Sequence, residues 1–359
     1  MSIGIITYHR AINYGAILQT YALQNYLTNH FDRETYVIDY LSKKIDSDYS
    51  TKYTMKSIVK KFLVGRYEDI TKKKFESFMM NNLVLSKSFD ADTISNVSNL
   101  YDVYFTGSDQ VWNYKGNNFD SNYFLNFVSD INKRNSYAAS IGMSSIPQEY
   151  NSFYYENLKK MNMISVREKS AKRIIDEFNL NKTVQVVVDP TLLLNKNDWF
   201  KLIKDKIEKQ TKQEYILIYS FSLSDSLYKL AIDLSKKTGL PIYSITNSPK
   251  NWRGIKKITG VGPLDFLSLF FNAKYILTNS FHGTAFAINF NKVFWVDLST
   301  SVNKAVTSRI TDLLEELNIK ERSNLVPDNL IIDYNLVNSK LELMREKSNH
   351  FLSMVCSNE

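Results

Sequence analysis

Short apolar runs, polar turns and helical stripes follow one another along most of this chain. In its first half, runs of strand length lie at 3–7, 35–40, 101–107, 164–166 and 184–188. The stretch after the first run places Ile17, Leu18, Tyr21, Leu23 and Leu27 on one helical face. A strand, a loop, a helix and a second strand in this order form a βαβ unit, so the pattern predicts a parallel sheet with covering helices.

The second half repeats this alternation. Strands are predicted at 215–219, 242–245, 275–277 and 293–296, and helices at 223–237, 263–272, 283–290, 304–317 and 328–354. A chain of 359 residues exceeds what one hydrophobic core usually organises. We therefore expect an α/β protein with two Rossmann-type doubly wound domains, at 1–190 and 191–327, and a C-terminal helix within 328–359 that crosses back to the first domain.

The stretch 275–289, YILTNSFHGTAFAIN, combines a strand, a polar turn and a small-residue helix. It places His282 at the turn beside the hydroxyls of Ser280 and Thr284. A helix beginning at Gly283 would direct its free N–H groups and positive dipole end to the same place as the imidazole. Such a site suits an anion. The same spacing also fits a histidine that only caps the helix or stabilises the fold.

Polar residues follow other predicted strands as well. Asn13 and Gly15 come after the first strand, Ser108 and Asp109 after the strand at 101–107, and Arg167 directly after 164–166. The carboxyl ends of parallel strands border the ligand crevice in open α/β folds. Each position has a structural alternative, since Asp109 could cap a helix and Arg167 could form a surface ion pair. No GxGxxG sequence occurs, so a dinucleotide is weakly supported.

Charge and cysteine content narrow the classes of partner. The formal charge of +8 favours anionic ligands, although most lysines are dispersed, which is equally explained by solubility. No recognised nucleic-acid motif appears. The segment 52–74 holds eight Lys or Arg among apolar residues, and a basic amphipathic helix there would suit peripheral membrane contact. Cys356 is the single cysteine, and neither a signal-peptide pattern nor eighteen consecutive apolar residues occur, so we expect a cytoplasmic protein.

Several of these stretches together resemble the polysaccharide pyruvyl transferase family. The resemblance runs over almost the whole chain in a fixed order: Asn13-Tyr14-Gly15-Ala16, Gly107-Ser108-Asp109-Gln110-Val111-Trp112, Ala138-Ala139-Ser140-Ile141-Gly142, Val166-Arg167-Glu168, Val188-Asp189-Pro190-Thr191 and Ser280-Phe281-His282-Gly283. It implies two Rossmann-type domains facing across a cleft, as in GT-B glycosyltransferases. It also implies transfer of the enolpyruvyl unit of phosphoenolpyruvate to two sugar hydroxyls, which leaves a cyclic ketal and phosphate.

The resemblance assigns roles to residues. It makes His282 the candidate catalytic residue, and it gives donor binding to Arg167, Ser280, Phe281, Gly283, Thr284 and Arg309 and acceptor-side roles to Asn13, Gly15, Ser108 and Asp109. Well-studied members carry Arg-Leu-His where this chain has Ser280-Phe281-His282. Either another cation (Arg309, Lys304 or Arg253) replaces the missing arginine, or the donor is not phosphoenolpyruvate.

The chemistry of ketal formation matches these residue types. Histidine can move protons in either direction near neutral pH. Phosphoenolpyruvate is highly anionic and suits an arginine fork at a helix N-terminus. The reaction demands no metal or other cofactor, and no His/Asp/Glu cluster in the sequence indicates one. The acceptor would be a sugar or a lipid-linked oligosaccharide, which would place the protein at the inner face of the membrane.

A nucleotide-sugar glycosyltransferase of GT-B type is the main alternative. Two Rossmann-type domains and an anion-binding helix start would serve a diphosphate equally well. A nucleic-acid-binding protein is the non-enzymatic alternative, and the dispersed lysines disfavour it.

Overall fold

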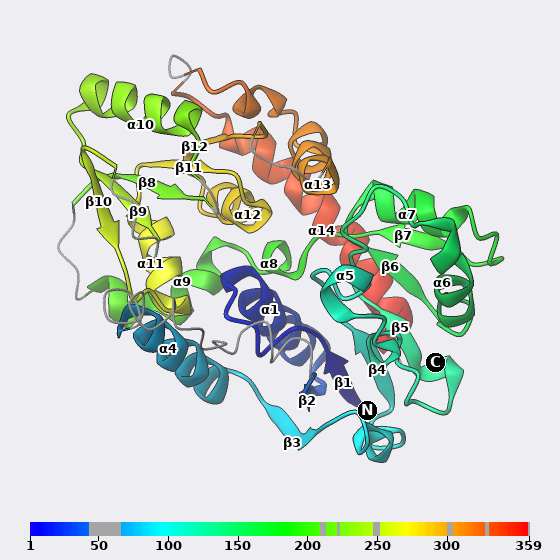
Figure 1. The fold of residues 1–359 in the computed structure, drawn as a ribbon. Coiled ribbons are helices and arrows are strands. Elements are labelled where there is room, and N and C mark those ends of the chain that lie inside the picture. The colour runs from blue at the N-terminus through cyan, green and yellow to red at the C-terminus, as the bar shows by residue number, and fades with distance from the viewer. Residues whose placement is uncertain are drawn as a thin grey trace, which may run out of the picture.

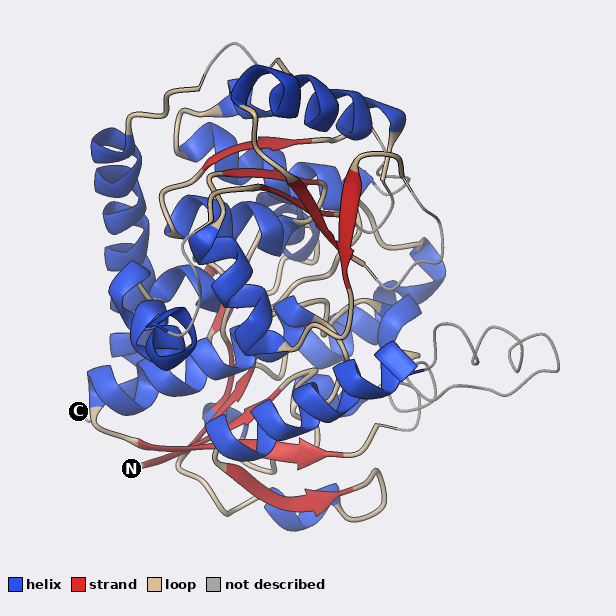
Figure 2. Cartoon of the chain, turned by 90° about the vertical axis from the view of Figure 1, so that its left-hand side faces the viewer, coloured by secondary structure: helices blue, strands red, loops and turns tan. Residues whose placement is uncertain are grey.

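Two five-stranded parallel sheets form the two halves of the molecule (Figure 1; Figure 2). The computed structural model describes residues 1–42, 66–208, 213–220, 223–246, 252–299, 304–326 and 330–357. Every strand pairing within the sheets is parallel. The α/β class follows directly from this arrangement.

The sheet of the N-terminal half has the order β3-β2-β1-β4-β5. Its strands are β1 (Ser2–Ile6), β2 (Glu34–Tyr40), β3 (Leu85–Phe89), β4 (Val103–Thr106) and β5 (Arg134–Ser136). A further parallel pair, β6 (Ile164–Val166) and β7 (Val184–Val186), lies beside β5 through isolated bridges such as Asn135 to Met163. The central strands are buried on both faces, which explains why they read as continuous apolar runs.

The sheet of the C-terminal half has the order β10-β9-β8-β11-β12, which is the same arrangement in chain order. Its strands are β8 (Ile216–Tyr219), β9 (Ile242–Ile245), β10 (Ile255–Ile258), β11 (Tyr275–Thr278) and β12 (Val293–Val296). Both sheets reverse their strand order beside the first strand, as doubly wound folds do. The prediction of two Rossmann-type sheets is confirmed.

Helices cover both sheets. In the described part of the N-terminal half these are α1 (Tyr14–Phe31), α4 (Arg66–Asn82), α5 (Tyr114–Asn117), α6 (Asn151–Leu158), α7 (Lys169–Asp176) and α8 (Pro190–Leu193). In that of the C-terminal half they are α9 (Lys196–Glu208), α10 (Asp225–Thr238), α11 (Pro263–Asn272), α12 (Phe281–Asn289), α13 (Lys304–Glu316) and α14 (Tyr334–Cys356).

One cluster of buried hydrophobic side chains spans the two halves, and each half has a further cluster of its own. Ile17 of α1, Leu192 of α8 and Phe286 of α12 belong to the same cluster of buried side chains. Helix α14 also contacts both halves: the hydroxyl of Tyr334 at its start donates to the carbonyl of Lys292, and the carbonyl of Cys356 at its end accepts from Arg33 of the α1–β2 connection. In Figure 1 this red helix runs from the C-terminal half to the strands of the N-terminal half.

Several local predictions were wrong. Strands β3 and β10 were not predicted because LSKSF and IKKI are largely polar edge strands without an apolar run. Helix α8 lies within 189–197, the stretch interpreted as a domain boundary, and α9 follows it; neither helix was predicted. The sequence also predicts a helix from Pro147 to about Met161, but in the structure this stretch begins as a 3₁₀ turn and α6 ends at Leu158. Helix α12 begins at Phe281 rather than at Gly283, so His282 lies in its first turn.

Candidate functional site

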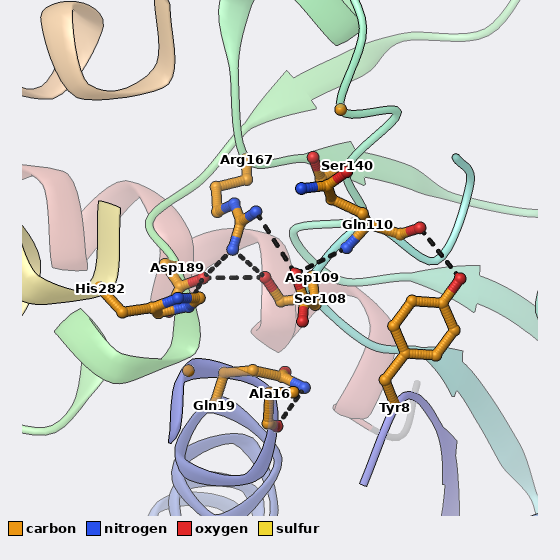
Figure 3. A network of polar contacts seen from close by, with 12 residues as sticks. Tyr8, Ala16, Gln19, Ser108, Asp109, Gln110, Ser140, Arg167, Asp189 and His282 are labelled. Carbon is orange, nitrogen blue, oxygen red and sulfur yellow. Dashed lines mark hydrogen bonds and ion pairs between the residues drawn. The ribbon is translucent and has the colours of Figure 1, made fainter. Parts of the chain in front are cut away.

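A buried carboxylate, Asp189, lies at the centre of the polar cluster in Figure 3. Its Oδ1 accepts hydrogen bonds from the backbone N–H of Thr191, at 2.9 Å, and from the hydroxyl of Thr191, at 2.7 Å, and so caps α8. Its Oδ2 accepts from Arg167 Nη1 at 2.6 Å and from Ser108 Oγ at 3.0 Å, and His282 Nε2 lies 3.5 Å away. Burial alone would raise the pKa of Asp189, but His282 and Arg167 outweigh it and hold the pKa well below its usual range.

Arg167 follows β6 directly, and its guanidinium is almost fully buried. Only Nη1 is hydrogen-bonded, since Nε and Nη2 have no hydrogen-bond partner. The nearest carboxylate oxygens to these two nitrogens are those of Glu168, at 3.8 Å, and Asp109, at 4.0 Å. The ring of Phe281 lies 4.7 Å from Cζ. Burial disfavours the charge, but Asp189 and Glu168 raise the pKa of Arg167, so a permanent cation presents two unused donors.

His282 reaches this cluster from the C-terminal half. It is the second residue of α12 and is 9% exposed. Its Nε2 is buried without a hydrogen bond. Its ring packs on Gly15 of α1, where a Cβ atom would lie 1.9 Å from Nδ1. Any side chain at residue 15 would therefore displace the imidazole, which explains the glycine.

The other residues of this turn are engaged in building the helix start. Ser280 is the N-cap of α12, and its Oγ accepts from the N–H of Gly283 at 3.4 Å. The hydroxyl of Thr284 donates to the carbonyl of Ser280 at 3.0 Å. A Cβ at Gly283 would lie 2.2 Å from Thr278 Oγ1, so this glycine allows close packing on β11. The first N–H groups of α12 lack partners within the helix.

The acceptor-side candidates lie on the N-terminal half. Asn13 caps α1, because its Oδ1 accepts from the N–H of Gly15 at 2.9 Å and from that of Ala16 at 3.3 Å. Asp109 follows β4 with a φ of 72°, a left-handed conformation that is costly for a residue with a side chain. Its side chain remains 13% exposed beside Arg167. The structure therefore brings Gly15, Ser108 and Asp109 around the same centre as Arg167 and His282.

A cavity of about 550 Å³ reaches the cluster from one side. Arg167, Asp189, Phe281 and Arg309 form its inner end, whereas His282 does not line it. Arg309 belongs to α13 and is 6% exposed. Burial and the charge of Arg167 lower the pKa of Arg309 to about 10. Two buried guanidinium groups thus share one cavity wall, an arrangement that an anion would stabilise.

The model of the family described as polysaccharide pyruvyl transferase matches residues 13–296 of this chain. The chain belongs to this family. Its members are transferases, and the family implies a polysaccharide or sugar acceptor. No curated protein matches this pyruvyl transferase-family chain.

Solved structures of other sugar enzymes are similar to this pyruvyl transferase-family chain only in outline. UDP-GlcNAc 2-epimerase from Methanocaldococcus jannaschii, in complex with UDP-GlcNAc and UDP, has 15% identity and a TM-score of 0.48, with 100% of this chain and 94% of that chain covered. The Neisseria meningitidis enzyme bound to UDP-GlcNAc has 13% identity and a TM-score of 0.48, with coverage of 98% and 100%. ADP-heptose lps heptosyltransferase II from E. coli has 10% identity and a TM-score of 0.43, with coverage of 96% and 99%. Nothing about the substrate of this chain follows from these likenesses.

The family resemblance left open which cation stands in for an arginine at position 280. Of the three candidates, Arg309 shares a cavity with Arg167. Arg253 is exposed next to the edge strand β10. The side chain of Lys304 lies outside the described residues. Arg309 is therefore the candidate that the structure brings to the cluster.

Sequence reasoning missed Asp189 as a site residue. Its signal was present, because Asp189 ends the apolar run at 184–188 and precedes Pro190, but that pattern indicated only a turn at a domain boundary. Glu168 was also missed. It is 2% exposed, its Oε1 accepts from Ser140 Oγ at 2.8 Å, and its Oε2 has no hydrogen-bond partner.

A second cluster, formed by His9, Arg10, Asp39 and Ser88, lies at the same end of the N-terminal sheet. Asp39 Oδ1 accepts from His9 Nε2 at 2.9 Å and from Arg10 Nε at 2.6 Å, and Oδ2 accepts from Arg10 Nη2 at 2.7 Å and from the hydroxyl of Ser88. His9 Nδ1 lies 3.1 Å from the carbonyl oxygen of Thr7. Both ring nitrogens of His9 therefore lie within hydrogen-bonding distance of an oxygen atom.

The predicted membrane-contact segment falls mostly outside the described residues. Only 66–74 is described, at the start of α4, where Lys74 donates to Asp265 of α11 at 2.7 Å. Phe75 and Phe78 of the same helix are buried in the protein core. In the described parts of the chain, no helix is both long and apolar enough to cross a membrane. Among the same residues, no group of three or more His, Cys, Asp or Glu side chains is placed to hold a metal ion.

Proposed function

We propose that this chain moves the enolpyruvyl group of phosphoenolpyruvate onto two hydroxyls of a sugar in a cell-surface or exopolysaccharide precursor, forming a cyclic pyruvate ketal. The observation that carries the proposal is the buried Arg167–Arg309 pair beside His282, at the N-terminus of α12. The family supplies the reaction class, and the arrangement of charges supports this donor.

The donor's negative charge matches the cluster. Phosphoenolpyruvate carries a phosphate and a carboxylate, and Arg167 offers Nε and Nη2 as two parallel donors that have no hydrogen bond in the protein. Arg309 adds a second positive charge to the same cavity, where burial and the charge of Arg167 lower its pKa. The helix dipole of α12 acts in the same direction. Arg309 therefore takes the part of the arginine absent at position 280.

His282 is the proposed proton-transfer residue. Ketal formation adds a proton to the methylene carbon of the donor and removes one proton from each of two acceptor hydroxyls. Two C–O bonds form at the central donor carbon, and the bond from this carbon to the phosphate oxygen breaks, with the electron pair leaving on phosphate. One of the two hydroxyl protons balances the proton added to carbon, and the other leaves with hydrogen phosphate. Asp189, 3.5 Å from His282 Nε2, stabilises the ring whenever it is positive.

The acceptor sugar would approach from the N-terminal half. Asp109 and the N-terminus of α1 near Asn13 face the cluster from that side, and the partly exposed Asp109 carboxylate can accept a hydrogen bond from a sugar hydroxyl. We place the reaction in the cytoplasm, on a sugar or lipid-linked oligosaccharide made there. No cofactor other than the donor substrate is required by this chemistry.

The direct test supplies isotopically labelled phosphoenolpyruvate together with a panel of glycosides and lipid-linked oligosaccharides. Label that enters the glycan as an acid-labile ketal, with release of one phosphate per transfer, is the expected result. Parallel reactions with UDP-sugars and ADP-sugars test the glycosyltransferase alternative. Transfer of a sugar without use of phosphoenolpyruvate would replace the proposed function by that alternative.

A further inference from the structure

The cavity beside Arg167 continues outward from the cluster to the protein surface. Its lining comes mainly from α13, from α14 and from the segment 186–189 at the end of β7, and Lys169 at the start of α7 completes it. At its outer end Leu343 of α14 is 58% exposed, and Lys340 and Lys347 lie one turn before it and one turn after it. The inner end is the Arg167–Arg309 pair. The cavity therefore connects solvent with the buried guanidinium groups.

The charged side chains along this passage favour the binding of anions over that of cations. Five basic side chains and three carboxylates line the cavity. Two of the carboxylates are paired within it, Asp189 with Arg167 and Glu316 with Lys169 at 3.0 Å. Among the described residues, Lys340 and Lys347 have no carboxylate within 4.0 Å. A passage walled by low-dielectric protein and rimmed by two uncompensated lysines concentrates small anions.

We infer that this cavity is the passage through which small anions reach and leave the Arg167–Arg309 pair, separately from the sugar acceptor. The inference rests on the proposed function for the identity of those anions, phosphoenolpyruvate inward and hydrogen phosphate outward. Its location supports the separation, because His282 does not line the cavity whereas Asp189 and Arg167 do. An acceptor bound on the side of Asp109 leaves the passage open.

The reaction needs such a route. When the bond between the central donor carbon and the phosphate oxygen breaks, the phosphate keeps the electron pair and remains against two cations. A bulky glycan on the N-terminal side would block escape in that direction. Departure through the cavity lets phosphate move from the buried arginines to Lys340 and Lys347 at the rim, and then to solvent.

A cysteine placed inside the passage tests it independently of activity. Val187 lines the cavity and is 5% exposed, so Val187→Cys introduces a thiol there with little change in volume. The native Cys356 is fully buried, and burial raises the pKa of its thiol to about 12, so it serves as an unreactive background. The probes are an anionic sulfonatoethyl and a cationic trimethylammonioethyl methanethiosulfonate, each normalised to its rate with a free thiol.

The anionic probe should react about tenfold faster than the cationic one at low ionic strength. The double substitution Lys340→Glu and Lys347→Glu should abolish this preference, and Leu343→Trp should slow both probes. Leu336→Trp is the matched control, since Leu336 is a 49% exposed leucine of the same helix that does not line the cavity. Equal rates for the two probes, or no effect of Leu343→Trp, would contradict the inference that small anions use this passage.

Steady-state kinetics distinguishes a failure of the anion passage from a failure of the proposed function. The double lysine variant should lower kcat/KM for phosphoenolpyruvate most strongly at low salt and leave the KM of the acceptor unchanged. If the parent protein does not use phosphoenolpyruvate but the labelling pattern holds, the proposed donor is wrong and the anion passage stands. The opposite outcome is parental turnover of phosphoenolpyruvate together with labelling rates that depend neither on the charge of the probe nor on Leu343→Trp. In that case the anion passage is wrong and the proposed function stands.

Discussion

Two buried clusters at the carboxyl end of the N-terminal sheet contain the same side-chain types and differ in how completely these side chains are hydrogen-bonded. Asp39 binds His9, Arg10 and Ser88, and Asp189 binds Arg167 and Ser108 and lies near His282. In the Asp39 cluster both nitrogens of His9 contact oxygen atoms. In the Asp189 cluster three nitrogens, Nε and Nη2 of Arg167 and Nε2 of His282, are buried without hydrogen bonds.

On this difference we base the proposal that the Asp189 cluster binds a ligand and the Asp39 cluster serves the fold. A buried polar group without a partner costs about 1–3 kcal/mol, and more when it is charged. The Asp39 cluster avoids this cost and so stabilises the loop after β1. The Asp189 cluster still carries the cost of unpaired nitrogens, and it adjoins a cavity. A ligand that supplies the missing acceptors would therefore bind favourably. Residue types alone would not distinguish the two.

The largest effect is expected from His282→Gln. If His282 moves protons in the reaction, kcat should fall by about a hundred- to ten-thousand-fold while phosphoenolpyruvate affinity, measured by calorimetry, changes little. The measurement is the rate of label transfer from phosphoenolpyruvate. His9→Gln is the matched control and should lower stability more than turnover. Near-parental turnover by His282→Gln would contradict a proton-transfer role.

In the Asp39 cluster the largest effect should be on folding. Asp39→Asn removes the carboxylate that accepts from the buried His9 and neutralises the partly buried Arg10, and we expect a loss of about 3 kcal/mol in the free energy of unfolding. Denaturant unfolding measures it. Glu156→Gln, which removes the exposed partner of Lys159, is the control and should cost no more than about 1 kcal/mol. Equal losses for the two variants would show that the Asp39 cluster is not structural.

The Asp39 cluster should also set part of the acid sensitivity. Burial raises the pKa of Asp39, but hydrogen bonds from His9 and Arg10 outweigh burial and hold the pKa well below its usual range. A carboxyl with a lowered folded-state pKa contributes stability that is full above the unfolded value, about 3.9, and is lost as the pH falls further toward the folded value. Unfolding followed from pH 5 downward should therefore show a shallower pH dependence below about pH 4 for Asp39→Asn than for the parent. Parallel curves would contradict this assignment.

Hydrophobic patterning predicted much of the fold because most strands are buried on both faces. The runs near Ile3, Phe105 and Ile276 have no polar face and are recognisable without tertiary information. The edge strands β3 and β10 carry lysine and serine, so their pairing depends on neighbours that the local sequence does not reveal. The helix start at Phe281 depends on the capping geometry of Ser280, which spacing locates only within a residue or two.

The candidate site was only partly predictable for a related reason. Arg167 and His282 could be predicted as site residues because each follows a predicted strand. Asp189 was seen only as a turn residue, since its interaction with a histidine 93 positions away follows from how the two halves pack. Whether a given arginine nitrogen is hydrogen-bonded depends on the same packing. The sequence therefore indicates which residues can form the site but not which of their atoms remain available.

A smaller effect is expected from Arg167→Lys. Lysine keeps the charge next to Asp189 but loses the planar pair of donors, so the donor should lose hydrogen bonds worth about 1.5–3 kcal/mol, or roughly tenfold or more in KM. Steady-state kinetics with varied phosphoenolpyruvate measures this. Arg10→Lys is the control in the other cluster and should leave the donor KM unchanged. If both variants have the parental donor KM, Arg167 does not bind the donor.

The smallest effect is expected from Ser280→Ala, at the position where relatives carry an arginine. Ser280 caps α12 through a long contact of 3.4 Å from the N–H of Gly283, so its loss should cost about 0.5–1 kcal/mol of stability. The donor KM should stay close to the parental value, because Arg309 rather than residue 280 supplies the second positive charge. Thermal unfolding and donor kinetics on the same preparation separate the two effects. A rise in donor KM as large as that of Arg167→Lys would show that the Ser280 hydroxyl contacts the donor, and the available hydrogen-bonding groups of the Asp189 cluster would then extend onto the turn before α12.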